Sequence, residues 1–253
     1  MTPEAVAAEA VEIQRLCSEQ EITVRLIGSL AIAARCPKHR WLMAALGRRE
    51  PRDIDLVTYS SHERTLHELL HRRGYLLHPS VSHSREWGVK RLIYTHQSHD
   101  GKVDVFLDQL VMAHTVDFTG HLDDEGVTVS VADLLLSKLQ IYRITSNDLI
   151  DLTVLLAEVD VGSGPGTIDI GRVREVLGTD WGFAHGAELN LARLIEVAGS
   201  TPALDPTIAA RVQARANRLL GEIDSAPKSV RWRLRSRIGE RAPWYEHVDD
   251  VDV

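Results

Sequence analysis

Apolar residues follow a strand-like spacing in the first part of the chain and a helix-like spacing after Ser130. In the first part, β-branched runs with alternating side chains predict strands, because successive side chains of a strand point to opposite faces. The predicted strands cover residues 22–27, 54–59, 89–95 and 102–107. Apolar residues at intervals of three and four predict amphipathic helices instead. These cover about 3–18, 30–34, 63–73, 130–142, 147–156, 170–178, 186–198, 206–223 and 229–239.

Glycines mark several element ends. Gly28-Ser29 separates the first strand from small helix-forming residues, so the sequence predicts a strand, a glycine turn and a helix. Gly74 follows the helix at 63–73, where a helix commonly ends. Asp100-Gly101 predicts a hairpin between the third and fourth strands. Residues 36–52 are expected to continue the second helix or to form an irregular insertion.

Strands followed by helices are typical of the α+β class and not of a regularly alternating fold. We expect residues 1–120 to form an α/β domain, 121–161 to add helices that complete it, and 167–253 to form a helical C-terminal region. Between them, the glycine-rich stretch 162–166 is expected to be a flexible joint.

Two polar residues are predicted to cap the helices that follow them. Ser130, with Asp133 three residues later, resembles a capping box. Asn147 is the predicted cap of the next helix, which should bury its leucines.

The composition is that of an ordinary globular protein, with 44% apolar residues in a chain of 253. Only two cysteines occur, Cys17 and Cys36, which excludes a disulfide framework and a four-thiolate zinc site. The acidic start at Glu4 and the lack of an apolar run of about 18 residues indicate neither a signal peptide nor a membrane span. We therefore expect a soluble, cytoplasmic protein with no membrane partner.

The formal net charge of −7 argues against binding nucleic acid by charge alone. Basic residues nevertheless concentrate at 228–241. One interpretation is an RNA-binding segment in which Trp232 stacks on a base. The other, which we prefer, is an amphipathic helix whose Val230, Leu234 and Ile238 pack on the domain while its arginines face solvent.

Two aspartates separated by one residue, Asp53 and Asp55, lie on a predicted strand. Alternation places both carboxylates on one face and Ile54 on the other. Asp104 lies on a later strand and completes a three-carboxylate site if the two strands are neighbours. Carboxylates this close repel one another unless a cation or a basic residue compensates them. Mg²⁺ suits them, because it prefers oxygen ligands and usually completes its shell with water and phosphate oxygens.

An exposed strand edge also explains Asp53 and Asp55, with Arg49 and Arg52 pairing the two acids. The glycine turn upstream favours ligand binding, because Gly28 lets the backbone approach a ligand and a helix start attracts phosphate. Three carboxylates and a glycine turn are the parts needed to hold a metal-bound nucleoside triphosphate.

These motifs resemble those of the nucleotidyltransferase superfamily of DNA polymerase β. The family pattern is an apolar residue, Gly, then Gly or Ser, a helix, Asp-x-Asp or Asp-x-Glu on a strand, and a third acid on a later strand. The corresponding residues here are Ile27-Gly28-Ser29, Asp53-Ile54-Asp55-Leu56 and Val103-Asp104-Val105. The resemblance implies a nucleotidyltransferase-like mixed β-sheet with flanking helices, followed by a helical C-terminal region.

The resemblance also implies an activity, a Mg²⁺- or Mn²⁺-dependent transfer of a nucleotidyl group from an NTP to a hydroxyl. Asp53 and Asp55 would bind the metal ion, and Asp104 would orient or deprotonate the attacking hydroxyl, through a second metal ion in one version. Gly28 and Ser29 would hold the terminal phosphates.

The following helices extend the resemblance, which covers roughly residues 20–158 in all. Residues 132–139 and 147–152 resemble the Lys-Leu helix and the Lys-Asp-x-x-Asp-Leu helix of nucleotidyltransferase-like toxins from abortive-infection systems. Lys138 would contact phosphate, although a solvated helix lysine explains it equally well. Asp148 would support Lys138 or simply stabilise the start of its own helix.

Four other residues are secondary candidates. Lys90, Arg91 and Tyr94 lie along a predicted strand and could approach a phosphate or a nucleobase, but a solvated strand face is the simpler explanation. Arg143 is a candidate supporting residue of the nucleotide site.

The leading hypothesis is a Mg²⁺-dependent nucleotidyltransferase whose acceptor hydroxyl belongs to a tRNA, a protein or a small molecule. The more specific form of this hypothesis is a toxin that acts on tRNA and has a cognate antitoxin. The negative net charge is an argument against this more specific form. The alternative is a non-catalytic nucleotidyltransferase-like module that binds a nucleotide or a partner protein. Metal-assisted phosphoester hydrolysis is a third hypothesis. Three converging acids favour catalysis, because a module without a metal ion has no need of them.

Overall fold

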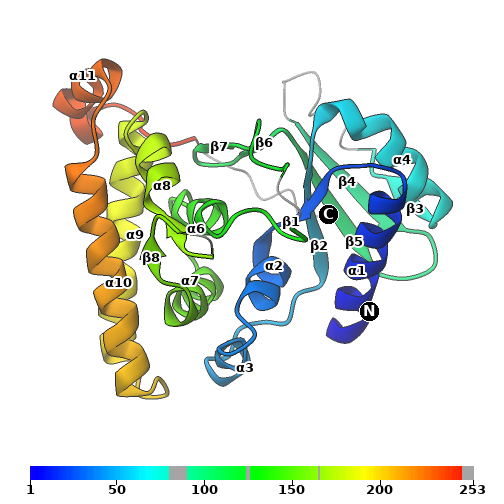
Figure 1. Ribbon diagram of the computed structural model, residues 1–253, viewed down its shortest axis with the longest axis horizontal. Coiled ribbons are helices and arrows are strands. Elements are labelled where there is room, and N and C mark those ends of the chain that lie inside the picture. The colour runs from blue at the N-terminus through cyan, green and yellow to red at the C-terminus, as the bar shows by residue number, and fades with distance from the viewer. Residues whose placement is uncertain (80–89, 124–125, 165, 247–253) are drawn as a thin grey trace. The chain divides into compact units, whose positions relative to one another are not determined.

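The computed structural model of the chain describes residues 1–79, 90–123, 126–164 and 166–246. The chain divides into two compact units, whose elements are labelled in Figure 1. The first unit comprises residues 1–34, 50–111 and 117–129, and the second comprises residues 35–49, 112–116 and 130–253.

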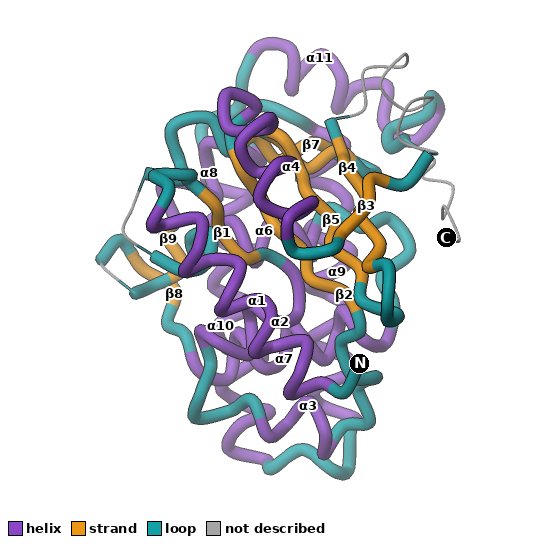
Figure 2. The backbone as a smooth tube through the Cα atoms, turned by 90° about the vertical axis from the view of Figure 1, so that its right-hand side faces the viewer, coloured by secondary structure: helices purple, strands orange, loops and turns teal. Residues whose placement is uncertain are grey.

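The first unit contains a five-stranded mixed sheet in the order β1-β2-β5-β4-β3, whose strands lie side by side in Figure 2. The strands are β1 (Val24–Leu26), β2 (Asp53–Thr58), β3 (Tyr75–Leu77), β4 (Arg91–His96) and β5 (Lys102–Leu107). β2 and β5 run parallel, whereas the other neighbouring pairs are antiparallel. The predicted hairpin of β4 and β5 is therefore confirmed.

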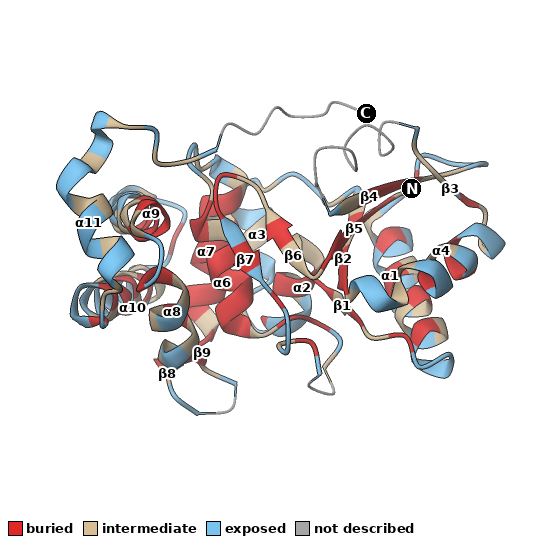
Figure 3. Cartoon of the chain, turned by 90° about the horizontal axis from the view of Figure 1, so that it is seen from above, coloured by how far each residue is buried: buried red, intermediate tan, exposed pale blue. Residues whose placement is uncertain are grey.

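Two helices pack on this sheet and on each other, as Figure 3 shows. Helix α1 (Pro3–Glu19) contacts β1 and β2, and its buried residues recur at helical intervals. Helix α4 (Glu63–Arg72) contacts β3 and follows the short 3₁₀ helix η1 (Ser60–His62). It ends just before Gly74, which has a φ of +88°. The prediction that this helix ends next to Gly74 is thus confirmed.

The second unit is mostly helical. Its helices are α3 (Trp41–Ala45), α6 (Val131–Leu139), α7 (Ser146–Glu158), α8 (Ile170–Leu177), α9 (Trp181–Ser200), α10 (Pro206–Ser225), α11 (Val230–Ile238) and the 3₁₀ helix η2 (Gly239–Arg241). α10 packs against α7, α8 and α9, and it buries residues spaced three or four apart. Among the helices in the described part of the chain, none is long and apolar enough to cross a membrane.

Short strands also lie outside the five-stranded sheet. β6 (Gln109–Val111) belongs to the first unit, and β7 (Thr115–Asp117) includes residues of both units. β8 (Val161–Gly162) and β9 (Ile168–Asp169) pair in parallel on either side of the glycine-rich stretch, and both belong to the second unit.

The α+β class is confirmed, with a mixed sheet, flanking helices and helices throughout the C-terminal half. Three details differ from the sequence-based expectation. β3 was not predicted, because three residues are too few to show alternation. The 36–52 region contains the short helix α3. The predicted strand at 89–95 begins at Arg91, and Val89 lies outside the described residues.

The prediction that Asn147 caps its helix is wrong, because α7 begins one residue earlier. Thr145 is the cap: its Oγ1 accepts a hydrogen bond from the backbone N–H of Asp148 at 3.3 Å. The Asp148 carboxylate accepts one from the Thr145 N–H in return, which completes a capping box. Ser130 does cap α6 as predicted, since its hydroxyl accepts the N–H of Asp133 at 3.0 Å.

The prediction that Val230, Leu234 and Ile238 pack on the domain is also wrong. Their exposed fractions are 68%, 56% and 47%, so the apolar stripe of α11 faces outward. The helix is anchored instead through Arg235, which donates hydrogen bonds to three carbonyl groups of residues 239–243. Its guanidinium also lies 4.8 Å from the ring centre of Trp181. Cation–π and polar contacts of Arg235 therefore hold this helix, and not the burial of its apolar stripe that was expected.

Candidate functional site

The three predicted acids of the first unit lie on one face of two neighbouring strands. β2 and β5 run parallel, and Asp55 is the direct register partner of Asp104. Asp53 lies two residues earlier on β2, so its side chain points to the same face. The intervening Ile54 is buried, as alternation predicts. β2 and β5 are therefore neighbouring strands, as the three-carboxylate hypothesis requires.

Gly28 brings the start of α2 (Gly28–Arg35) against this face. The backbone N–H of Ile27 donates to the Asp55 carbonyl at 3.0 Å, which ties the end of β1 to β2. Gly28 has a φ of +72°, and a Cβ atom there would lie less than 3.0 Å from Oδ2 of Asp55. A side chain at position 28 would therefore displace the Asp55 carboxylate. The glycine is required by the contact between the helix start and Asp55.

Two basic residues neutralise part of the acidic face. Lys102 lies on β5 as the register partner of Asp53, and its Nζ is 4.0 Å from Oδ2 of Asp53 and 3.6 Å from Oδ2 of Asp104. Arg91 on β4 donates a hydrogen bond to the same oxygen of Asp104. Its guanidinium also lies 5.6 Å from the ring centre of Phe106. Asp53 and Asp104 are therefore paired with cations of the chain itself.

The two ends of the acidic face differ in exposure. The Asp104 side chain is only 5% exposed, and its buried Oδ1 has no hydrogen-bond partner among the residues that the structure describes. The Asp53 side chain is 46% exposed. Partial burial raises the pKa of Asp53; Lys102 opposes this rise, and the neighbouring charge of Asp104 adds to it. Asp53 would therefore gain from an additional cation, and Asp104 keeps one oxygen for a further ligand.

This donor set fits a divalent cation that prefers oxygen. The three carboxylates are Mg²⁺-type ligands, and Oδ1 of Asp104 is a buried lone-pair donor that meets no hydrogen-bond donor in the described part of the chain. Within the described residues, no group of three or more His, Cys, Asp or Glu side chains is already arranged around one metal position. A metal ion would thus require the acidic side chains to turn away from Lys102 and Arg91.

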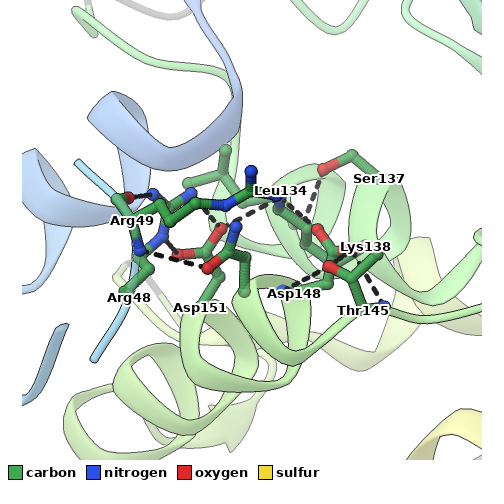
Figure 4. Close-up of polar contacts among 9 residues, drawn as sticks. Arg48, Arg49, Leu134, Ser137, Lys138, Thr145, Asp148 and Asp151 are labelled. Atoms are coloured by element: carbon green, nitrogen blue, oxygen red, sulfur yellow. Dashed lines mark hydrogen bonds and ion pairs between the residues drawn. The ribbon is translucent and has the colours of Figure 1, made fainter. Parts of the chain in front are cut away.

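The predicted phosphate contact Lys138 lies in the second unit, in the buried ion network of Figure 4. Its Nζ donates to Asp148 at 2.8 Å and lies 2.9 Å from Oδ2 of Asp151. Burial by itself would lower the pKa of Lys138, but the charges of Asp151 and Asp148 outweigh it and raise the pKa. Lys138 is therefore a stably charged ammonium held by two carboxylates. Its contact with phosphate stays a prediction.

Arg48 completes this network from the segment after α3. It donates two hydrogen bonds to the Asp151 carboxylate, one of them at 3.0 Å from its Nη2. Asn147, which does not cap the helix, accepts a hydrogen bond from the N–H of Arg49 at 3.2 Å. Asp148 pairs with Lys138 and also completes the capping box at the start of α7, so its supporting role in a nucleotide site stays a prediction. Burial by itself would raise the pKa of Asp148, but Lys138 and Thr145 outweigh it and lower the pKa.

The secondary candidates have other surroundings. Lys90 pairs with Asp108 at 2.9 Å. The ring of Tyr94 is fully buried, which excludes the solvated strand face proposed for it. Arg143 is exposed, and its guanidinium lies 6.0 Å from the ring centre of Tyr142. These contacts assign no ligand to Lys90 or Arg143, whose site roles stay predictions.

Sequence reasoning missed the cations that face the acids. Lys102 could have been found, because it stands two residues before Asp104 and therefore on the same face of the strand. Arg91 was considered only for phosphate or base contacts, since its pairing with Asp104 depends on the order of β4 and β5 in the sheet. Asp151 and Arg48 were likewise given no role.

Comparison with known proteins finds similarity to solved structures. No known family model matches the sequence. No curated protein matches it either. The solved structure of the lincosamide antibiotic adenylyltransferase LnuA, bound to lincomycin, is 20% identical, with a TM-score of 0.39, covering 58% of this chain and 94% of that one. The antibiotic-resistance factor ANT(2'')-Ia is 11% identical, with a TM-score of 0.40, covering 95% of this chain and 96% of that one. Similarity at this level does not establish the function of this chain.

Proposed function

We propose that the first unit transfers a nucleotidyl group from a nucleoside triphosphate to a hydroxyl acceptor. The observation that carries the proposal is the register of β2 and β5, which makes Asp55 and Asp104 direct neighbours with Asp53 on the same face. The start of α2 meets this face at Gly28. Carboxylates for a divalent cation and backbone N–H groups for phosphate are thus supplied side by side.

The carboxylates would act by binding and positioning. Asp53 and Asp55 would hold Mg²⁺ or Mn²⁺, which when bound supplies positive charge against the triphosphate and the leaving pyrophosphate. Gly28 and Ser29 would bind phosphate oxygens through N–H groups at the start of α2. Asp104 would accept a hydrogen bond from the acceptor hydroxyl and take its proton.

The bonds made and broken follow from these positions. The acceptor oxygen forms a bond to the α-phosphorus of the NTP while the bond from that phosphorus to the bridging oxygen of pyrophosphate breaks. The hydroxyl proton passes to a carboxylate oxygen of Asp104. Among the described residues Oδ1 has no hydrogen-bond partner, whereas Lys102 and Arg91 both contact Oδ2, so Oδ1 would take the proton once the side chain turns toward the acceptor.

The acceptor is a tRNA, a protein or a small molecule that carries a hydroxyl group. The net charge of −7 disfavours an acceptor that binds through many phosphates. A protein or small-molecule hydroxyl is therefore the acceptor class that we rank first. A toxin role with a cognate antitoxin is the narrower form of the proposal and depends on tRNA as the acceptor.

A second candidate is a non-catalytic module that binds a nucleotide or a partner. It is favoured by the contacts of Lys102 and Arg91, which neutralise the acids without any ligand. On this view the acids and cations are a structural ion network that needs no metal ion.

One experiment separates the two candidates. The purified protein is incubated with each α-labelled NTP and Mg²⁺ or Mn²⁺ in separate pools of RNA, protein and metabolites. We expect label to be transferred to one pool by the wild type and by the control Asp224→Asn, an exposed residue of α10. The Asp53→Asn/Asp55→Asn variant should transfer none. No transfer to any pool, with metal-nucleotide binding intact, would favour the binding module, and label recovered as nucleoside monophosphate with release of pyrophosphate would identify water as the acceptor.

A further inference from the structure

Lys102 occupies the fourth corner of the grid that the three aspartates form on the sheet. The register pairs Asp53 with Lys102 and Asp55 with Asp104, so three neighbouring positions are acids and the fourth is a lysine. Nζ of Lys102 lies within 4.0 Å of Asp53 and 3.6 Å of Asp104. One ammonium group therefore contacts carboxylates from two different strands, which is a position that a bound cation would also take.

The acidic face favours the ammonium group of Lys102 between Asp53 and Asp104 only while no other cation is bound there. The Lys102 side chain is 18% exposed, and the rotatable bonds of its four-carbon stem allow the ammonium group to move. With Arg91 on Asp104, the three acids and two bases leave a formal charge of −1 on the face. A divalent cation would reverse that charge and repel an ammonium held about 4 Å away.

We propose that Lys102 is an internal counter-cation that a divalent metal ion displaces, and that the displaced ammonium then binds the phosphates of the incoming nucleotide. The inference rests on the proposed function. Because the lysine competes with the metal ion for the same carboxylates, the metal ion alone should bind weakly. Because the triphosphate offers the lysine a new partner, nucleotide should strengthen metal binding, and the two ligands bind cooperatively.

The opposite view makes Lys102 a fixed structural partner of Asp53 and Asp104. Its removal would then destabilise the fold and weaken metal binding or leave it unchanged, because the carboxylates would lose the residue that positions them. The two views therefore predict different directions for the metal affinity of a variant without the ammonium group.

The test compares three variants of the full chain. Lys102→Met removes the charge at nearly constant length, and Lys102→Arg keeps it. Lys38→Met is the matched control, because Lys38 is an exposed lysine of the second unit whose side chain makes no ion pair within the described residues. Mn²⁺ affinity is measured from the paramagnetic resonance signal of free Mn²⁺, first alone and then with α,β-methylene-ATP and α,β-methylene-GTP.

We expect Lys102→Met to bind Mn²⁺ alone about tenfold more tightly than the wild type, since an ammonium about 4 Å from the metal ligands opposes the metal ion. The strengthening of Mn²⁺ binding by nucleotide should fall by a similar factor. Lys102→Arg and Lys38→Met should keep the wild-type behaviour. In thermal unfolding, Mn²⁺ alone should stabilise Lys102→Met more than it stabilises the wild type.

Two outcomes would overturn the inference. One is an unchanged or weaker Mn²⁺ affinity in Lys102→Met, and the other is an unchanged effect of nucleotide. If Asp53→Asn/Asp55→Asn still abolishes binding of Mn²⁺ with nucleotide, the proposed function survives either outcome. If the wild type binds no Mn²⁺ with or without either nucleotide, both proposals fail. Lys102→Gln provides the same comparison if Lys102→Met does not fold.

Discussion

Replacing Gly28 with alanine perturbs the backbone and the site at the same point. Gly28 has a φ of +72°, and an alanine there would place its Cβ less than 3.0 Å from Oδ2 of Asp55. The left-handed conformation costs an L-residue roughly 1–2 kcal/mol. The clash itself involves the tip of a side chain, so rotation of the Asp55 carboxylate relieves it. We therefore expect a moderate loss of stability together with a displaced carboxylate.

Gly120 is the matched control for this change. It belongs to the same unit, has a φ of +73°, and has no atom of the described residues within 4 Å of the position that a Cβ would take. Gly120→Ala should thus lose roughly 1–2 kcal/mol of unfolding free energy from the backbone alone. Gly28→Ala should lose about the same amount. Only Gly28→Ala should weaken binding of Mn²⁺ with nucleotide, by on the order of 10- to 100-fold, as when a group that orients a metal ligand is lost.

Urea unfolding followed by circular dichroism measures the stability of both variants, and the paramagnetic resonance of free Mn²⁺ measures binding. Wild-type binding in Gly28→Ala would refute the reasoning that Gly28 serves the position of Asp55. An equal loss of binding in Gly120→Ala would refute it as well, because the effect would then follow from backbone strain at any site in this unit.

Three further predictions concern the second unit. Lys138→Met should lower the unfolding free energy by about 3–5 kcal/mol in urea, because it leaves the buried Asp148 and Asp151 without their shared cation; a loss below about 1 kcal/mol would contradict this. The folded pKa of Asp148 is lowered, so its stabilising contribution is complete above the unfolded pKa of about 3.9 and is lost as pH falls through the folded value. Asp148→Asn should therefore lose less stability than the wild type on acidification below about pH 4, and an unchanged acid slope would count against the network. Leu234→Gln should change stability by less than about 0.5 kcal/mol, because the side chain is already 56% exposed; a larger loss would mean that the stripe of α11 is covered.

Local patterns predicted the elements that carry the acids. Asp53 and Asp55 alternate with apolar residues, and the structure places them on β2 with Ile54 buried between them. The hairpin of β4 and β5 and the helix end at Gly74 also follow from neighbouring residues, through turn chemistry. Such features depend on dihedral angles and on alternation, which a short stretch of sequence determines.

The features that sequence did not predict depend on contacts between distant segments. The outward stripe of α11 is an example, because periodicity identifies the apolar side of a helix but not what covers it. Here a neighbouring side of the helix makes the contacts, through Arg235 with the ring of Trp181 and with the carbonyls of residues 239–243. The predicted cap of α7 was wrong because Thr145 and Asn147 are both residues that commonly cap helices. Which of them is the cap depends on the residue at which the helix begins, and boundaries of this kind are uncertain by one or two residues.

One of the two basic residues that face the acids could have been predicted from the sequence, and the other could not. Three carboxylates on one sheet face repel one another, so a folded chain must place cations beside them or bind cations from solution. In a sheet the nearest positions on the same face are two residues away along the strand and across to its neighbours. Lys102 occupies the first kind of position relative to Asp104. Arg91 on β4 reaches Asp104 diagonally, because its register partner is Phe106, two residues after Asp104 on the same face of β5. The lysine two residues before the third acid is therefore a signal that the same alternation rule provides, whereas the arginine requires the strand order. A basic residue at that spacing marks an acidic site whose charge is balanced before any ligand arrives, and this is why we expect metal ion and nucleotide to bind together.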